Sequence, residues 1–432
     1  MIFGQFSEQS FVLEPGDLVP ARGSRALLEQ GDTRGWLAEM HERLRHLLPK
    51  GPRALVTEDL TDKEGRPIDV FGHFGIDRGG LASLRHNYHG LAHTAQASGA
   101  TSEEEKPTPP WPGFEDVWIP VGAGVEVSGR IGFARRRDGS VADADCIVIL
   151  PGILGDNNVL RTRDLAAALV SSGLHALALE LRGHGATWRG RPDLFYTFGG
   201  LETLDLLAVS RWLEARPHIR RAGLVGFCWG ANHALLAAFM DTGPRDHPSL
   251  TQRLAEIQGQ VPDERHFRAG MIAFSPVLRF EELLAELKRP WSKFRNAVMA
   301  GMQTSIRSRM TRRGYANPTG SLLDLIHAEF ARSPLSYADG VKDAIHMLRF
   351  LPYDGLAEGD KLRDIRVPLL LVHAANDPLA PAQDVADLAA RVRNPRLAAL
   401  VLAGGGHVGF AAYAKAYYFN LILNFFAAGA SA

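Results

Sequence analysis

Cysteine is scarce in this sequence of 432 residues, in which only Cys146 and Cys228 are present. Two cysteines do not make the disulfide framework of a small secreted protein. The opening residues, MIFGQFSEQSF, lack a positively charged start followed by an apolar stretch, so we expect no secretion signal. We therefore predict a cytoplasmic protein with reduced thiols.

An excess of charge of either sign is also absent. Lys and Arg together number 48, and Asp and Glu together number 48 as well. Without a global basic field there is little to attract nucleic acid, and we expect no such partner. No segment approaches the run of about 18 apolar residues that a membrane-spanning helix needs. Motifs for phosphate loops, dinucleotides and metal sites are missing, so we expect neither a cofactor nor a metal.

Strands and helices are predicted to alternate beyond residue 113. Apolar and β-branched runs predict strands at 117–120, 125–134, 146–150, 175–180, 222–226, 270–274, 368–373 and 397–402. Helical spacing is found at 156–172, 201–215, 232–240 and 410–427. This alternation predicts an α/β fold, in which a mostly parallel sheet is covered by helices on both faces. Reactive side chains gather at the carboxyl ends of the strands in such sheets.

Two segments interrupt the alternation. The stretch SGATSEEEKPTPPWPG, residues 98–113, is polar and proline-rich, as is typical of a linker. We therefore predict an N-terminal extension and linker over 1–113, containing a helix at 33–48, and a main α/β domain over 114–432. Between about 277 and 363 the pattern is helical without clear strands, and we expect a lid insertion there. We expect its arginine cluster to be solvated, namely Arg307, Arg309, Arg312 and Arg313.

The stretch LVGFCWGAN, residues 224–232, places a cysteine between two glycines directly after an apolar run. The spacing is that of a nucleophile elbow, G-x-S-x-G, with Cys228 in the serine position. Gly226 and Gly230 would avoid clashes in the tight turn, and the start of the following helix would favour a thiolate. Either Cys228 is a catalytic thiol, or the scaffold of a serine enzyme has drifted, or the cysteine is buried in an ordinary strand–helix junction.

Three further turns supply candidate partners for Cys228. Asp377 lies at the tip of HAANDPLAP, after an apolar strand, where a carboxylate can orient an imidazole. His407 follows the glycines of GGGHVGF and is the candidate general base. The chain order nucleophile, acid, histidine is the one expected of an α/β-hydrolase. In the turn PGILG, residues 151–155, we expect Ile153, with Leu154 as the alternative, to form an oxyanion hole with the backbone N–H of Trp229.

The motifs PGILGDNN, LRGHG, GFCWGAN, HAANDPLAP and GGHVGF together resemble the α/β-hydrolase superfamily, and most closely the YheT-like hydrolases. The resemblance extends from Val117 to the C-terminus. It implies a hydrolase with nucleophile Cys228, acid Asp377 and base His407. Those relatives have serine at the nucleophile position and often glycine where this chain has Ala231. A cysteine in this elbow also resembles dienelactone hydrolases and polyhydroxyalkanoate synthases.

These residues leave three functions open. The first is a hydrolase that cleaves a carboxylic ester, thioester or lactone through an acyl-Cys228 intermediate. The second is an acyltransferase or polyester synthase that uses the same three residues, because a thioester can pass its acyl group to nucleophiles other than water. The third is a non-catalytic binding protein that kept the fold. In each enzymatic case the partner is a small-molecule acyl substrate, and neither its identity nor the oligomeric state follows from the sequence.

Overall fold

The computed structural model describes residues 19, 25–49, 55–56, 81–98, 107, 109–153, 155–243, 265–280, 295–332, 350 and 361–427. Within these residues nine strands form one sheet, in the order β1-β9-β8-β7-β6-β4-β5-β3-β2. The strands are β1 (Leu55–Val56), β2 (Phe114–Gly122), β3 (Val125–Gly132), β4 (Ala144–Leu150), β5 (His175–Glu180), β6 (Ile219–Phe227), β7 (Gly270–Phe274), β8 (Leu369–Ala374) and β9 (Leu397–Leu402). The central strands, from β5 across to β9, run parallel, and β1, β2 and β3 join the edges antiparallel. The predicted, mostly parallel sheet is confirmed.

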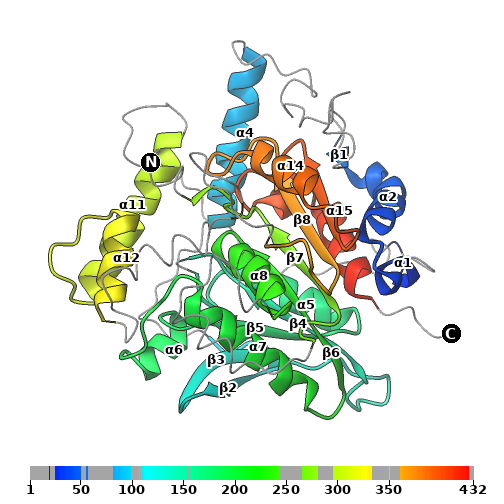
Figure 1. Cartoon of the computed structure of the whole chain (residues 1–432), viewed down its shortest axis with the longest axis horizontal. Helices are drawn as coiled ribbons and strands as arrows, with labels where there is room; N and C mark the ends of the chain where they lie inside the picture. Colours follow the sequence, from blue (N-terminus) through cyan, green and yellow to red (C-terminus); the bar gives the residue numbers. More distant parts are fainter. Residues whose placement is uncertain are drawn as a thin grey trace.

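Helices connect the parallel strands, as the alternation predicted (Figure 1). They are α1 (Arg25–Gln30), α2 (Thr33–Leu44), α4 (Leu81–Ser98), α5 (Leu160–Ser171), α6 (Gly185–Gly190), α7 (Gly200–Glu214), α8 (Trp229–Met240), α11 (Arg295–Arg312), α12 (Leu322–Ala331), α14 (Ala382–Arg391) and α15 (Phe410–Phe426). No helix in the described part of the chain combines the length and the apolar character needed to cross a bilayer.

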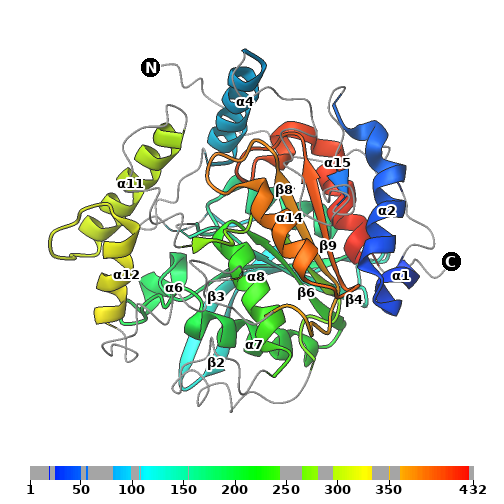
Figure 2. The same cartoon turned by 45° about the horizontal axis from the view of Figure 1, so that its top comes forward.

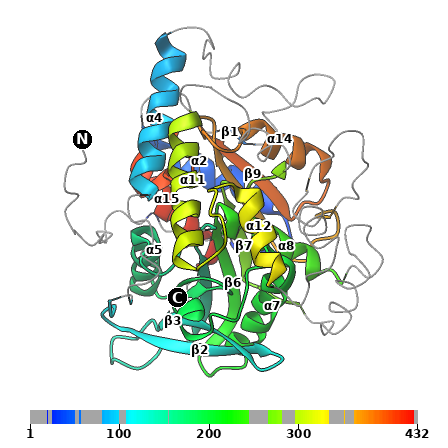
Figure 3. The ribbon, with the colours of Figure 1, turned by 90° about the vertical axis from the view of Figure 1, so that its left-hand side faces the viewer.

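The sheet is buried on both faces, and its strands are therefore apolar at consecutive positions. In β4, Val148 and Leu150 belong to a core shared with α7, α8 and α14. Ile147 and Ile149 belong to a second core, with α2, α5 and α15. Figure 3 shows the layers edge on, with α5 and α15 on one side of the strands and α7 and α8 on the other. The predicted helices on both faces are confirmed.

The described N-terminal helices pack directly on this sheet domain. Trp36 of α2 meets Phe425 of α15 edge to face, with ring centroids 5.1 Å apart. Strand β1 pairs with β9 through Leu55 and Val401. Figure 2 shows α1 and α2 beside α15. Helix α2, followed by a 3₁₀ turn over Arg45–Leu47, confirms the helix predicted at 33–48.

Helices α11 and α12 lie in the chain between β7 and β8 and stand beside α6, at the side of the molecule (Figure 1). Their arginines are not all solvated as we expected. Arg309 is 2% exposed and its Nη2 donates to the carbonyl oxygen of Gly183 at 2.6 Å. Arg313 donates to the same carbonyl and forms an ion pair with Glu329 at 3.0 Å. The expectation was wrong for these two because a carbonyl and a buried carboxylate replace their water. Arg307 and Arg312 are exposed.

Candidate functional site

Cys228 lies at the sharp turn between β6 and α8, with φ 55° and ψ −115°. A non-glycine residue held in such a conformation costs of order 1–3 kcal/mol, which surrounding contacts must offset. A Cβ atom on Gly226 would overlap the carbonyl oxygen of Gly230. A Cβ atom on Gly230 would lie 2.5 Å from the carbonyl oxygen of Pro151. The predicted role of the two glycines is confirmed, and Cys228 as a whole residue is half-buried.

The neighbouring strand β7 fixes this turn. The backbone N–H of Cys228 donates to the carbonyl oxygen of Phe274 at 2.9 Å. Asn232, on the first turns of α8, donates to the carbonyl oxygen of Val277 at 2.7 Å and accepts from the Val277 N–H at 2.8 Å. Three hydrogen bonds therefore hold the strained turn to the end of β7 and to the segment that follows it.

Asp377 and His407 come together from the ends of two neighbouring strands, β8 and β9. Nδ1 of His407 lies 2.9 Å from Oδ2 and 3.2 Å from Oδ1 of Asp377, so Nδ1–H donates to the carboxylate. Oδ1 of Asp377 also accepts from the N–H groups of Leu379 and Ala380, at 2.8 and 3.0 Å. The carboxylate is fully buried and the imidazole nearly so. A carboxylate in this position orients the ring and stabilises its protonated form.

The remaining ring nitrogen of His407, Nε2, is buried without a nitrogen or oxygen partner, and Cys228 interacts with this ring. Burial opposes ionisation of Cys228, but the charge of His407, a hydrogen bond with its ring and the backbone N–H of Trp229 outweigh burial and lower the pKa of the thiol. Burial also opposes protonation of His407, yet the charges of Asp377 and Cys228 raise its pKa. Electrostatics therefore favour a thiolate beside an imidazolium.

The turn that starts at Pro151 lies against the cysteine. A Cβ atom on Gly152 would lie 3.3 Å from Cβ and 3.6 Å from Sγ of Cys228. The next residue, Ile153, is held by His184, whose Nε2 donates to the Ile153 carbonyl oxygen at 2.6 Å. Of the two predicted oxyanion donors, Trp229 contacts Cys228 through its backbone N–H. Ile153 directly follows Gly152 in the turn that lies against the cysteine. Leu154, the alternative donor, is outside the described residues.

Glu180, at the end of β5, supports the same region. Its carboxylate accepts from the N–H of Asn157 at 2.9 Å and from the N–H of Ala186 at 2.7 Å. Burial raises its pKa to about 7. The carboxylate thereby joins the segment after Ile153 to the start of α6.

Helix α4 contacts the loops of both Asp377 and His407, which the sequence did not lead us to expect. Thr94 Oγ1 accepts from the backbone N–H of His407 at 2.8 Å. The same hydroxyl donates to the carbonyl oxygen of Gly90 at 2.7 Å. A Cβ atom on Gly90 would overlap the carbonyl oxygen of Asn376, so only glycine permits this approach. The one available signal was a glycine inside the helical segment LASLRHNYHGLAHTAQAS.

The second cysteine is not part of this arrangement. Cys146 is fully buried in β4, and burial raises the pKa of its thiol. Among the described residues, no group of three or more His, Cys, Asp or Glu side chains is placed to hold a metal ion.

The chain matches the alpha/beta hydrolase family model over residues 147–418. It is similar to the solved esterase Pf2001 of Pyrococcus furiosus, with 18% identity and a TM-score of 0.45 over 74% of this chain and 94% of that one. It is also similar to 2,6-dihydroxy-pseudo-oxynicotine hydrolase, with 13% identity and a TM-score of 0.46 over 94% of each chain. For brefeldin A esterase, a bacterial homologue of human hormone sensitive lipase, identity is 17% and the TM-score 0.42, over 78% and 84%.

These structural similarities are too low to bear on substrate or reaction. The assignment of the chain to a family therefore depends on the family model alone. It covers well over half of the chain and includes the Cys228 turn, the Asp377 turn and the His407 loop. The predicted α/β-hydrolase fold and the expectation of a hydrolase-type enzyme are confirmed at this level. The protein is a member of the alpha/beta hydrolase family.

Proposed function

We propose that the protein hydrolyses a carboxylic ester, thioester or lactone through an acyl-Cys228 intermediate, with His407 as the base and Asp377 as the residue that orients it. The supporting observation is the line of contacts from the buried Asp377 carboxylate through His407 to a half-buried thiol in a strained turn. On its motifs the chain is nearest to the YheT-like hydrolases. The substrate is a small acyl compound, and the two free thiols fit a reducing, cytoplasmic setting.

In the first half of the reaction, the thiolate of Cys228 attacks the carbonyl carbon of the substrate. A C–S bond forms, and the carbonyl electron pair moves to the oxygen, where the N–H groups of Ile153 and Trp229 stabilise the charge. When this intermediate collapses, the bond to the leaving group breaks. The leaving alkoxide or thiolate takes the proton from Nε2 of His407. The products are an acyl-Cys228 thioester and a free alcohol or thiol.

In the second half, neutral His407 accepts a proton from water through Nε2, and the oxygen attacks the thioester carbonyl. Collapse of the second intermediate breaks the C–S bond and releases the carboxylic acid. The thiolate–imidazolium pair is then restored for another turnover. An alcohol in place of water would give a new ester by the same steps, so acyl transfer is the second outcome that the chemistry permits.

We further propose that α11 and α12 belong to a lid. Arg309 and Arg313 both donate to the carbonyl oxygen of Gly183, in the turn that carries His184. His184 in turn donates to the carbonyl oxygen of Ile153, which follows Gly152 in the turn beside Cys228. Two hydrogen-bond steps therefore connect the insertion to the proposed oxyanion donor, which supports a role close to the substrate.

A panel of p-nitrophenyl esters of increasing chain length tests the proposal. Wild-type protein should release p-nitrophenol, and Cys228→Ala should abolish release. Cys146→Ala, which removes the other, fully buried thiol, should retain turnover and serves as the matched control. Adding an alcohol acceptor separates hydrolysis from acyl transfer by the product formed. An alanine variant at position 228 as fast as wild type would remove the mechanism, and a wild-type protein that releases no p-nitrophenol would favour a binding protein.

A further inference from the structure

A pocket of about 260 Å³ opens at the edge of the sheet opposite Cys228. Its residues stand at the starts of the strands whose far ends carry the proposed catalytic groups. Arg221 lies early in β6, Arg268 precedes β7, and Arg396 directly precedes β9. Because a strand rises about 3.3 Å per residue, the length of β6 puts roughly 20 Å between this pocket and Cys228. The pocket is therefore not part of the site for the acyl substrate.

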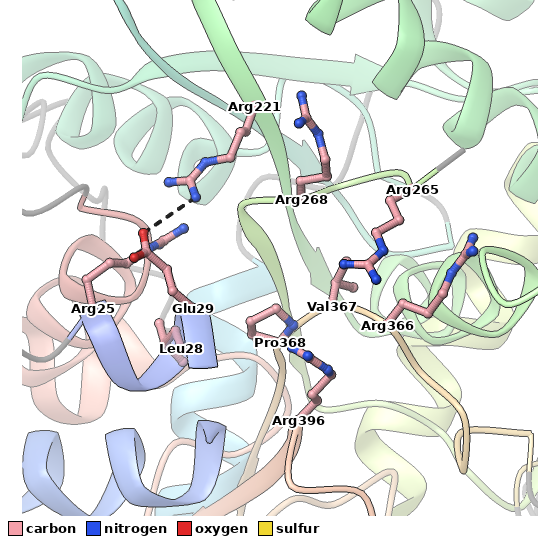
Figure 4. Close-up of a pocket in the computed structure, with 10 residues that line it drawn as sticks. All are labelled: Arg25, Leu28, Glu29, Arg221, Arg265, Arg268, Arg366, Val367, Pro368 and Arg396. Atoms are coloured by element: carbon pink, nitrogen blue, oxygen red, sulfur yellow. Dashed lines mark ion pairs between the residues drawn. The ribbon is translucent and has the colours of Figure 1, made fainter. Parts of the chain in front are cut away.

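Arginine dominates the lining of this pocket. Figure 4 shows guanidinium groups around it on every side, with Glu29 as the one acidic residue among those that line it. Three of the arginines are paired with carboxylates that balance their charge. The pairs are Arg221 with Asp145 at 2.7 Å, Arg268 with Glu214 at 2.7 Å, and Arg366 with Asp241 at 3.2 Å.

The charge of Arg25 is balanced only weakly, because its ion-pair partner Glu29 also pairs with Arg221, at 3.8 Å (Figure 4). Arg25 is 7% exposed, and its Nη groups donate to the carbonyl oxygens of Phe425 and Ala269, at 2.6 and 3.2 Å. These carbonyls satisfy hydrogen bonds but carry no net charge. Glu29 is 3.9 Å away and mostly exposed to solvent. Burial and the neighbouring charge of Arg221 lower the pKa of Arg25 to about 10, as expected where positive charges crowd together.

Arg265 and Arg396 are the remaining two arginines that line the pocket. Neither has an acidic partner within the part of the chain that the structure describes. The guanidinium of Arg396 lies against Gly31, where a Cβ atom would be 2.6 Å from Cζ, so the backbone at Gly31 makes room for it. Counted over the described residues, Glu29 offsets one of the charges of Arg25, Arg265 and Arg396, and two positive charges of the lining stay unbalanced.

We propose that this pocket binds a small anion through a diphosphate group. Arginine forks match phosphate oxygens with paired hydrogen bonds, and a diphosphate carries at least two negative charges at neutral pH, enough to balance the surplus. The ligand would bridge α1 to the starts of β7, β8 and β9. Free pyrophosphate and the diphosphate of a nucleotide share this chemistry, and the site lies too far from Cys228 for either to be the molecule that is cleaved.

Isothermal titration of the full-length protein with inorganic pyrophosphate tests the proposal, in a buffer whose ionic strength is held constant with sodium chloride. Wild type should bind one equivalent, and Arg396→Gln and Arg265→Gln should each weaken binding by about tenfold or more, the usual effect of losing one charge-assisted pair. Arg137→Gln, which removes an exposed arginine between β3 and β4, is the matched control and should bind as wild type does.

Two further arms complete the experiment. ADP binding more tightly than pyrophosphate would identify a nucleotide as the source of the diphosphate, and equal affinities would identify the free anion. Saturating pyrophosphate should leave the rate of Cys228 alkylation by iodoacetamide unchanged, which places the ligand away from the thiol. The proposal is overturned if wild type shows no heat beyond the salt control, if both arginine variants bind as wild type does, or if pyrophosphate blocks alkylation. Circular dichroism confirms that each variant is folded.

Discussion

Replacing Thr94 with valine removes one hydroxyl group from α4 and keeps nearly the same side-chain shape. The hydroxyl accepts from the backbone N–H of His407 at 2.8 Å, and both residues are at least 96% buried. In the valine variant this N–H stays buried without a partner. The variant therefore tests whether α4, which is remote in sequence from the other site residues, holds His407 in place.

The size of the effect follows from the lost hydrogen bond. A buried donor without a partner costs about 1–3 kcal/mol. The loop before His407 contains Gly404, Gly405 and Gly406, so it can relax while the rest of the domain stays folded. Since about 1.4 kcal/mol is a factor of ten, relaxation of this loop should reduce the fraction of correctly placed imidazole by about 5- to 150-fold. We expect kcat to fall by a factor in this range, with little change in KM.

Iodoacetamide alkylation of Cys228 across a pH series is the most direct assay for this effect. With His407 displaced, the thiol loses the charge that lowers its pKa, so the midpoint of the alkylation curve should move to higher pH. Thr94→Ser retains the hydroxyl and should restore both the midpoint and kcat. Buried Cys146 reports on unfolding, because it should react only if the domain opens. A folded valine variant with the wild-type alkylation curve and kcat would show that Thr94 does not hold His407 in place.

Three more predictions concern Asp377, Cys228 and Gly226. Asp377→Asn removes the negative charge that raises the pKa of His407, so the imidazole should be neutral near pH 7 and kcat should fall by about 10²- to 10⁴-fold in steady-state ester hydrolysis; an unchanged kcat would exclude the proposed role. In wild type the pKa of Cys228 is lowered, so its thiolate appears at lower pH than in an ordinary cysteine, and alkylation should have its midpoint below about pH 8.5. A midpoint at or above that value contradicts the ion pair. Gly226→Ala places a Cβ atom on the Gly230 carbonyl oxygen and should lower the free energy of unfolding by about 2–4 kcal/mol in urea denaturation, whereas an undiminished value would mean that the turn is looser than described.

The strands and the turns at their ends were predictable from the sequence because local rules determine them. A parallel strand buried on both faces must be apolar throughout, and β4, β7 and β9 lie within one or two residues of the predicted ranges. The Cys228 turn was predictable because it brings backbone carbonyl groups too close to Gly226 and Gly230 for a Cβ atom, so glycines are needed at this fixed spacing. The meeting of Asp377 with His407 follows from topology, since neighbouring parallel strands bring their carboxyl ends to one edge.

The contribution of α4 could not be predicted, because its contacts join residues far apart in the chain. Thr94 and His407 are separated by 313 positions, and a threonine in a helix gives no local sign of such a bond. Gly90 was visible in the sequence, but the carbonyl of Asn376 that requires it was not.

The buried guanidinium groups of Arg309, in α11, and of Arg313, directly after it, could not be predicted for a similar reason. A run of arginines normally indicates a solvated surface. Only the fold reveals that the Gly183 carbonyl and Glu329 lie within reach of Arg309 and Arg313. A charged residue can be buried where the fold brings a hydrogen-bond or ion-pair partner to it from elsewhere in the chain. Local sequence patterns do not show which residues the fold brings together.

Trapping the acyl-enzyme is the most direct test of the proposed acyl-Cys228 intermediate. Wild-type protein is mixed with excess p-nitrophenyl butyrate, quenched in acid within the first turnovers, and examined by intact-mass and peptide mass spectrometry. The acyl-Cys228 mechanism predicts one added butyryl group on the peptide that contains Cys228, and no added group in Cys228→Ala. Turnover without any adduct on Cys228, or an adduct that survives in the alanine variant, would contradict it.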